Sequence, residues 1–369
     1  MKKIALLPIS LFAALALTAC GDDSSSPAAP EGGSQPTLSS DALPGSSDSN
    51  PSSSTTGPGS SGAVPPASST VEPGSSASVP PGSSAAVSVP EGFTAEAVVV
   101  PETNCTTAPV AFGVGVEVTC DGQYLGPIME DDDKTAFDPN AASYADFVGI
   151  QKVFASLQAD EKVVFLMRHA HRTNSTDVDG VLTGWGYLQA ENVGQKIASA
   201  ENILYWHSEV PRTLQTCMAI AKGRGQTEII HKALPELNGG WFEKDHSKIE
   251  EYNATVSSSY EVISRWAYNE YKDEASNFDE GFYNLMERGE QFMQDIVVAQ
   301  VAAQSRISVI ISHDQMIFPM VIFATNKQIE MKYHEDKSWL NFLAGVAIII
   351  KADGSKKYVP LKGLDSGFQ

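Results

Sequence analysis

The chain has 369 residues and a formal net charge of −20 at pH 7. Most of the excess negative charge lies in residues 21–133, which contain fifteen acidic side chains and no Lys or Arg. An acidic chain without a basic stripe argues against nucleic-acid binding, and a polyanionic substrate would need its own local cluster of positive charge.

The first 20 residues have the pattern of an export signal. Lys2 and Lys3 precede an apolar segment, 4–17, which is too short to span a membrane and has the length of a signal-peptide core. The following Leu17-Thr18-Ala19-Cys20 resembles the bacterial lipobox, which implies that Cys20 becomes the lipidated first residue of the mature protein. Acyl chains on Cys20 would attach the protein to a membrane without a spanning helix. The alternative is a plain secretory signal with a chance cysteine.

Residues 21–91 are expected to form a tether. Gly21 follows the lipobox, and in enteric-type sorting a residue other than Asp at this position favours the outer membrane. We therefore expect a bacterial cell-envelope protein that faces the periplasm or the surface. The segment consists mainly of Ser, Pro, Gly and Ala, and cannot bury enough apolar surface to offset the entropy of ordering. This composition predicts a disordered, extended linker.

Residues 92–135 are predicted to form a small β unit. Cys105 and Cys120 flank a strand-like, glycine-punctuated run at 110–118. In an exported protein this pair predicts a disulfide that closes a β-hairpin. Cys217 then remains as a free thiol in a predicted helix, where a buried cysteine behaves as a small hydrophobe rather than as a nucleophile.

Residues 136–369 have the composition of a globular domain that is large enough for a substantial core. Expected strands are 163–167, 202–207, 228–231, 308–312 and 344–350, with 357–361 as a sixth candidate. Expected helices are 144–157, 184–200, 210–222, 249–272, 278–303 and 315–324. This alternation predicts a three-layer α/β/α sandwich with a mostly parallel central sheet. The helical stretch 249–303 would be an insertion that sets substrate choice.

The apolar run 163–167 ends in Arg168-His169-Ala170-His171-Arg172. Histidine can act as a nucleophile, and the planar fork of arginine suits a phosphate dianion. Taken alone, these residues are equally compatible with a basic surface loop. Segments containing Arg212, Glu236 and His313 follow three later strands, and in an α/β sheet such segments converge on one rim. Together they predict a phosphate pocket with a nucleophile and a proton donor.

Five segments in this order resemble the histidine phosphatase superfamily, which has the phosphoglycerate-mutase-like fold. They are 168–172, 182–190, the segments around Arg212 and Glu236, and 312–314, so the resemblance covers roughly residues 160–330. It implies that His169 is the nucleophile and that His313 is a second, protonated pocket histidine. It also implies that Arg168, Arg172 and Arg212 hold the phosphate. Ala170 departs from the glycine that the family usually has after its first histidine.

The resemblance leaves two candidates for the proton donor, because the two branches of the family place it differently. One branch points to Glu236 and the other to Asp314. The sequence Gly239-Gly240-Trp241 that follows Glu236 fits the first branch better. In that case Asp314 would cap the helix that follows His313.

The implied activity is that of a metal-independent phosphomonoester hydrolase, a histidine acid phosphatase acting through a phosphohistidine intermediate. No cofactor or metal is expected, because arginines supply the positive charge, and the expected partner is a phosphorylated small molecule. The alternatives are an inactive envelope-anchored protein that binds a phosphate ligand, and a phosphomutase. His171 is equally compatible with the pocket wall and with a solvent-facing turn. The other histidines (His207, His231, His246 and His334) are assigned no role.

Overall fold

The computed structural model describes residues 89–130, 137–140, 143–173, 180–271 and 277–363. The predicted signal segment with Cys20, and the predicted tether up to residue 88, lie outside these residues. None of the helices within the described ranges combines the length and the apolar character needed to cross a bilayer.

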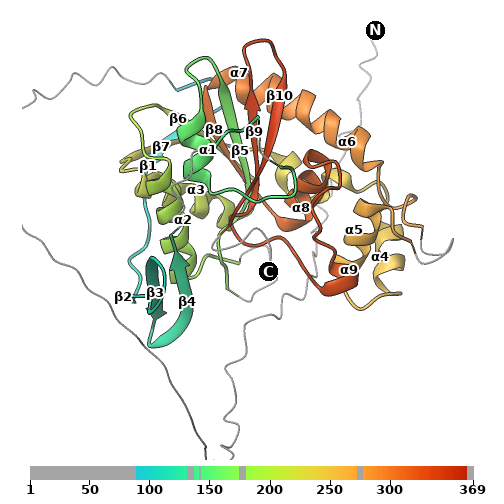
Figure 1. The fold of residues 1–369 in the computed structure, drawn as a ribbon, viewed down its shortest axis with the longest axis horizontal. Helices are drawn as coiled ribbons and strands as arrows, with labels where there is room; N and C mark the ends of the chain where they lie inside the picture. Colours follow the sequence, from blue (N-terminus) through green and yellow to red (C-terminus); the bar gives the residue numbers. More distant parts are fainter. Residues whose placement is uncertain (1–88, 131–136, 141–142, 174–179, 272–276, 364–369) are drawn as a thin grey trace, which may run out of the picture. The chain divides into compact units, whose positions relative to one another are not determined.

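A seven-stranded sheet with the order β1-β7-β6-β8-β5-β9-β10 forms the centre of the fold (Figure 1). Its strands are β1 (Thr94–Ala97), β5 (Lys162–Arg168), β6 (Ile203–His207), β7 (Glu228–Ala233), β8 (Ile307–Ser312), β9 (Gly345–Ile350) and β10 (Lys356–Leu361). The central strands β7, β6, β8 and β5 pair in parallel, while β1 and β9 run antiparallel to their neighbours. The mostly parallel sheet predicted from the sequence is confirmed.

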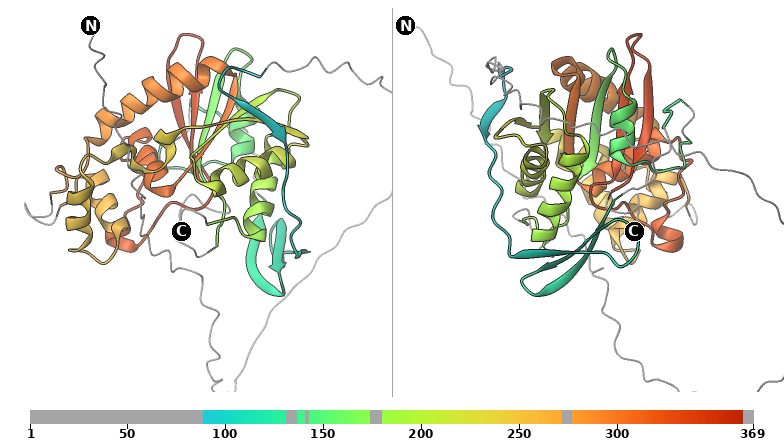
Figure 2. Two further views of the ribbon diagram at one scale, coloured as in Figure 1. Left: turned by 180° about the vertical axis from the view of Figure 1, so that it is seen from behind. Right: turned by 60° about the vertical axis from the view of Figure 1, so that its left-hand side comes forward.

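Helices cover both faces of this sheet (Figure 2). One face packs against α1 (Ile150–Ser156), α2 (Gly184–Lys196) and α3 (Pro211–Gly223). The other packs against α4 (His246–Asn253), α5 (Ser259–Tyr268), α6 (Leu285–Phe292), η4 (Met293–Val301), α7 (Ala302–Gln304) and α8 (Asp314–Ala324). Side chains of β5 alternate between the two cores, Phe165 on the first face and Leu166 on the second. Burial on both faces explains why this strand reads as an unbroken apolar run.

Two long predicted helices are interrupted in the structure. The stretch 249–272 divides into α4 and α5, because the Ser258 side chain accepts a hydrogen bond from the Tyr260 backbone at 3.2 Å and begins a new helix. The stretch 278–303 begins only at Leu285, where Asn284 caps α6, and its second half, η4, is π-helical. Polar capping residues therefore override the continuous helical pattern.

The segment 92–135 contributes to two sheets rather than one. β1 pairs antiparallel with β7, with Thr94 opposite His231, and completes the edge of the central sheet. β2 (Cys105–Pro109), β3 (Gly115–Cys120) and β4 (Gln123–Met129) form a small antiparallel sheet beside α2 (Figure 1). A disulfide joins Cys105 and Cys120, which lie opposite each other on β2 and β3. The expected hairpin is therefore extended by a third strand.

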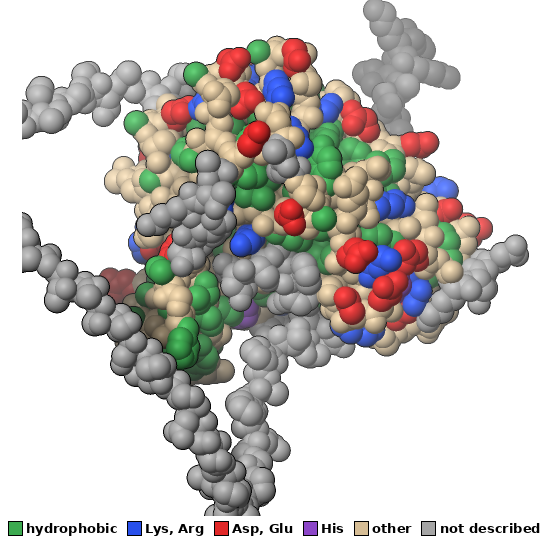
Figure 3. All heavy atoms as spheres, in the orientation of Figure 1, with side chains coloured by type: hydrophobic (Ala, Val, Ile, Leu, Met, Phe, Trp, Pro, Cys, Tyr) green, Lys and Arg blue, Asp and Glu red, His purple; other side chains and the backbone are tan. Residues whose placement is uncertain are grey.

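Acidic and basic side chains are intermixed on the face shown in Figure 3, notably around α5 and α9 (Tyr333–Asp336). In this region Lys332 Nζ lies 2.9 Å from Glu270 and 3.3 Å from Glu335. Exposed ion pairs of this kind contribute little to stability.

Candidate active site

The carboxyl ends of β5 and β8 bring the first and last predicted site segments together. Arg168 is opposite Ser312 in the parallel register, and the His169 backbone N–H donates to the Ser312 carbonyl at 2.9 Å. His169 and His313 therefore leave neighbouring strands side by side, with ring centroids 5.5 Å apart. Both side chains are buried, which excludes bulk water from the space around them.

Hydrogen bonding fixes the tautomer of His169. Its Nδ1 lies 2.8 Å from the Ala170 carbonyl oxygen, which can only accept, so Nδ1 carries the proton. Burial holds the pKa of His169 well below its usual value, and the positive charges of Arg168 and Arg212 lower it further. The ring is therefore neutral, and its Nε2 lone pair is available for nucleophilic attack.

Arg168 is fixed from three sides. Its Nη2 lies 3.0 Å from Asp314 Oδ2, its Nη1 donates to the Leu340 carbonyl at 2.5 Å, and its guanidinium carbon lies 4.1 Å from the centroid of the Phe342 ring. The side chain is almost completely buried. A buried guanidinium needs a charge partner and hydrogen bonds, and Asp314 and Leu340 provide them.

Asp314 acts as the anchor of this arginine. Its Oδ2 also accepts hydrogen bonds from Trp339 Nε1 at 3.0 Å and from the Tyr260 hydroxyl at 3.3 Å. Burial alone would raise the pKa of Asp314, but Arg168 and the Trp339 hydrogen bond outweigh it and hold the pKa below its ordinary value. Asp314 is therefore an ionised carboxylate whose Oδ2 is fully engaged. It is the first residue of α8, and the N-cap position belongs to His313.

His313 is neutral in this structure, contrary to the expectation that it is protonated. Arg212 Nη2 lies 3.2 Å from His313 Nδ1, and because a guanidinium can only donate, Nδ1 must accept. The proton then resides on Nε2, which lies 2.9 Å from Ser208 Oγ. Burial, followed by the charge of Arg212, lowers the pKa of His313 to about 3. The sequence identifies both His313 and Arg212, but not the contact between them that keeps His313 neutral.

Three arginines, Arg168, Arg172 and Arg212, lie beside His169 and His313 at the carboxyl ends of the strands. We call these five residues the phosphate pocket. Arg212 is the second residue of α3, after Pro211 at its first position, and is half-buried. Burial lowers the pKa of Arg212 to about 10, and the charges of Arg172 and Arg168 act in the same direction. Arg172 donates through Nη1 to the Thr173 carbonyl at 2.9 Å, and its segment forms an isolated bridge to Leu182. Mutual repulsion among these cations would be relieved by a bound dianion.

Glu236 lies in η1 (Pro235–Leu237), which two hydrogen bonds hold against the neighbouring strand ends. The Leu234 N–H donates to the His207 carbonyl at 2.9 Å, and Ser312 Oγ donates to the Leu237 carbonyl at 2.7 Å. Oε2 of Glu236 is buried and has no hydrogen-bond partner in the described part of the chain. The two carboxylates at this rim thus differ: that of Asp314 is tied to an arginine, whereas an oxygen of Glu236 is uncommitted.

Two hydroxyl residues complete the site but were not predicted from the sequence. Ser208 Oγ contacts His313, as described, and accepts from the Val210 N–H at 3.2 Å. Thr216 Oγ1 accepts from the Ala170 N–H at 3.1 Å, which fixes the turn after His169. The position of Ser208 immediately after a predicted strand is a signal that could have identified it.

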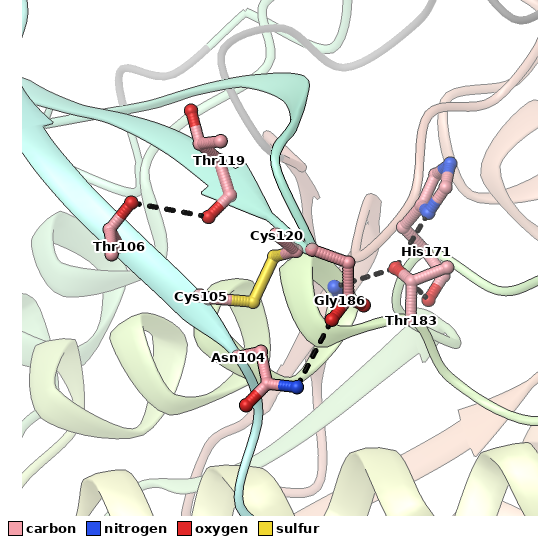
Figure 4. Close-up of a disulfide and its surroundings, with 9 residues drawn as sticks. Asn104, Cys105, Thr106, Thr119, Cys120, His171, Thr183 and Gly186 are labelled. Carbon is pink, nitrogen blue, oxygen red and sulfur yellow. Dashed lines mark hydrogen bonds between the residues drawn. A yellow bond between two sulfur atoms is a disulfide. The ribbon is translucent and has the colours of Figure 1, made fainter.

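His171 links the pocket to the small disulfide sheet (Figure 4). Its Nδ1 lies 2.9 Å from Oγ1 of Thr183, and Thr183 caps α2 by accepting from the Gly186 N–H. The disulfide packs against the next residue, Gly184, where an added Cβ would overlap Cys105 Sγ. Burial, followed by the charge of Arg168, lowers the pKa of His171 to about 4.

Aromatic side chains form the wall beside this histidine. The His171 ring centroid lies 4.8 Å from that of Trp185 and 5.0 Å from that of Phe342. Phe342 also lies 5.8 Å from the His169 ring and under Arg168. It comes from a loop with no periodic pattern, so the sequence offers no signal that places it here.

The remaining cysteine and histidines have partners outside the phosphate pocket. Burial raises the pKa of the Cys217 thiol, so this residue is a buried thiol rather than a thiolate nucleophile. His207 Nε2 lies 2.9 Å from His231 Nδ1, and His231 Nε2 lies 3.0 Å from Glu96 on β1. His334 contacts Glu270 at 2.9 Å.

The fold and the site together define a class of protein. The carboxyl end of an α/β sheet holds a buried, neutral histidine among three arginines. Residues 164–335, a little under half of the chain, match the profile of the histidine phosphatase superfamily, branch 1. This match indicates phosphatase or mutase chemistry for that part of the chain. No curated protein sequence matches the chain.

Several solved structures are similar to this chain at low sequence identity. One is phosphoglycerate mutase from Bacillus anthracis, with 15% identity over 56% of this chain and 94% of that chain, and a TM-score of 0.37. A second is mycobacterial glucosyl-3-phosphoglycerate phosphatase, with 12% identity over 56% of this chain and 100% of that chain, and a TM-score of 0.36. A third is phosphoserine phosphatase from Entamoeba histolytica in complex with 3-phosphoglyceric acid, with 17% identity over 53% and 94% and a TM-score of 0.35.

Proposed function

We propose that this protein is a metal-independent phosphomonoester hydrolase that acts through a phosphohistidine. The observation that carries the proposal is the state of His169, whose Nδ1–H donates to Ala170 while Nε2 is left unprotonated beside the arginine cluster. In the first step, Nε2 attacks phosphorus in line with the leaving oxygen, so that a P–N bond forms as the P–O bond breaks. Arg168, Arg172 and Arg212 stabilise the equatorial phosphoryl oxygens.

We assign the proton transfers to Glu236 rather than to Asp314. Asp314 is ion-paired with Arg168 and accepts from Trp339, so that protonating it would break the contacts that position the arginine. The uncommitted Oε2 of Glu236 supports the assignment. As an acid, Glu236 protonates the leaving alkoxide; as a carboxylate, it then takes a proton from the water that hydrolyses the P–N bond. The products are an alcohol, inorganic phosphate and the original histidine.

The test is hydrolysis of p-nitrophenyl phosphate between pH 4 and 7 by the full chain purified in detergent, before and after EDTA treatment. The wild type should turn over in both samples, and acid quenching should trap phosphate on His169. His169→Ala should lose activity by at least about a thousandfold. His334→Gln, a change at a histidine that contacts Ser264 and Glu270, is the matched control and should retain activity.

Three outcomes would overturn the assignment. Undiminished turnover by His169→Ala would exclude a histidine nucleophile. Phosphate binding without turnover in the wild type would favour a binding protein that has lost catalysis. Net transfer of phosphate between positions of one substrate, with no inorganic phosphate released, would instead identify a phosphomutase.

We also propose that the enzyme works in the bacterial cell envelope, held by acyl chains on Cys20, in the outer membrane. The lipobox-like sequence supports this placement, and the disulfide between Cys105 and Cys120 is consistent with an oxidising compartment. Labelling with a palmitate analogue should require Cys20, and Cys20→Ser should abolish it. Label retained in Cys20→Ser would refute the anchor.

A further inference from the structure

A groove that is open to solvent lies beside the phosphate pocket, between the η1–η2 loop and α4, where η2 is Gly240–Phe242. We call it the α4 groove. One part of its lining, which we call the near end, includes Asn238, Gly239 and Gln315, and another part includes Glu243, His246 and Glu250. Apolar side chains, among them Ile249 and Phe282, also line it.

The near end of the α4 groove adjoins the reacting groups. Asn238 follows Glu236 by two residues, and Gln315 follows His313 by two. The hydrogen bond from Ser312 Oγ to the Leu237 carbonyl holds these two segments together. A phosphoryl group among the arginines would thus direct its leaving oxygen past Glu236 and towards this groove.

The charge of the α4 groove is opposite to that of the phosphate pocket. Among the described residues that line it there is no Lys or Arg. Glu243 Oε2 lies 3.2 Å from His246 Nδ1, and Glu250 Oε1 lies 3.9 Å from His246 Nε2, so one imidazole is shared by two carboxylates. Asn253 adds a buried amide oxygen with no hydrogen-bond partner among the described residues. Hydrogen-bond acceptors and carboxylate charge therefore predominate in this part of the α4 groove.

We propose, building on the phosphatase function proposed above, that the α4 groove binds the leaving group of a phosphomonoester that carries an ammonium group. An ammonium offers three donors and one positive charge, which the carboxylates of Glu243 and Glu250 accept. A second anionic group on the substrate would meet Glu243 and Glu250, and the described lining has no Lys or Arg to compensate it. The enzyme therefore selects aminoalkyl or amino-sugar monophosphates and discriminates against phosphorylated acids.

Three sugar phosphates of similar size test this selectivity: glucosamine 6-phosphate, glucose 6-phosphate and 6-phosphogluconate. The wild-type chain should hydrolyse them with kcat/KM falling in that order, each step being roughly five- to tenfold because the carboxylates are partly exposed. The Glu243→Gln/Glu250→Gln double variant should bring the ratio between the first and last substrates close to one. Glu251→Gln is the matched control, since Glu251 is on α4 but pairs with Lys248 and does not line the groove.

The outcome separates this inference from the proposed activity. If p-nitrophenyl phosphate is hydrolysed but the three sugar phosphates react equally, or 6-phosphogluconate reacts best, the groove assignment is overturned and the phosphatase stands. If no phosphomonoester is hydrolysed, the phosphatase proposal fails, and selectivity is measured as Kd for the same three ligands on the wild-type chain. The same order supports the groove, and equal or reversed values refute it.

Discussion

The phosphate pocket and the small disulfide sheet are stabilised in different ways. The pocket lies at the end of strands that are buried on both faces, and its charged side chains are fixed by one another, as in the pair Arg168–Asp314. Among the described residues, the buried hydrophobic core of the small sheet consists of Val118, Cys120 and Ile128. Packing suffices for the first region, whereas the second depends on a covalent link and on its contact with α2.

The two regions meet at the start of α2. Thr183 caps this helix and contacts His171, and the neighbouring Gly184 lies against the disulfide. A weakly packed accessory sheet can therefore still affect the pocket, because it supports the end of α2 that contacts His171.

Glu236→Gln should lower kcat for an alkyl phosphate by about a thousandfold, because the amide cannot protonate the leaving alkoxide. The loss should be smaller for p-nitrophenyl phosphate, whose leaving group needs little protonation. Steady-state kinetics on the two substrates measures this dependence. If Asp314→Asn shows the leaving-group dependence and Glu236→Gln does not, the acid has been assigned to the wrong carboxylate.

Asp314→Asn should lower the free energy of unfolding by about 3 kcal/mol, because Arg168 would remain buried without its charge partner. Turnover should also fall, since the guanidinium would lose its fixed position. Urea unfolding gives the first quantity. Glu201→Gln, which removes the carboxylate from the exposed pair with Arg306, is the control and should change stability by less than about 1 kcal/mol. Equal effects at the two positions would contradict the prediction.

Replacing both Cys105 and Cys120 by Ser should lower the local opening free energy of β2–β4 by about 2–3 kcal/mol, given a sequence separation of 15 residues. Amide hydrogen exchange should accelerate in β3 and β4 but not in β5 and β8. Activity should fall only several-fold, through the contact between Thr183 and His171. Equal acceleration in the central strands would show that the two regions unfold as one.

Stability should fall as the pH decreases from about 6.5 towards 4. Burial lowers the pKa values of His207 and His171 to about 4 and that of His313 to about 3, so the unfolded chain binds more protons than the folded chain in this range. His207→Gln should flatten the slope of unfolding free energy by up to about 1.4 kcal/mol per pH unit. Urea unfolding at several pH values measures it, and parallel curves for the two proteins would refute the prediction.

Most of the central sheet was predictable because β5, β6, β8 and β9 are largely continuous apolar runs. Five of its strands and the sixth candidate are confirmed within one to two residues. β1 was not predicted, because its four residues, Thr94–Ala97, are largely exposed and have no hydrophobic pattern that marks a strand. The break between α4 and α5 depends on Ser258, whose capping role was not recognised in the sequence.

In the site, sequence order identified the residues that leave strand ends, and the structure brings His169, Arg168, Arg212 and His313 together. What the sequence could not predict is the protonation state of His313, which depends on burial and on Arg212. Nor could it identify the contacts of Trp339 and Phe342, because these come from a loop whose position is set only by tertiary packing.

Trp185 provides an optical reporter between the two regions. Its indole is close enough to β4 that a Cβ added at Gly126 would lie 3.0 Å from Cζ2, and its ring lies 4.8 Å from that of His171. One chromophore therefore contacts both the disulfide sheet and the wall of the phosphate pocket. The emission of this residue, isolated from the other four tryptophans, would register reduction of the disulfide and occupation of the pocket in a single spectrum.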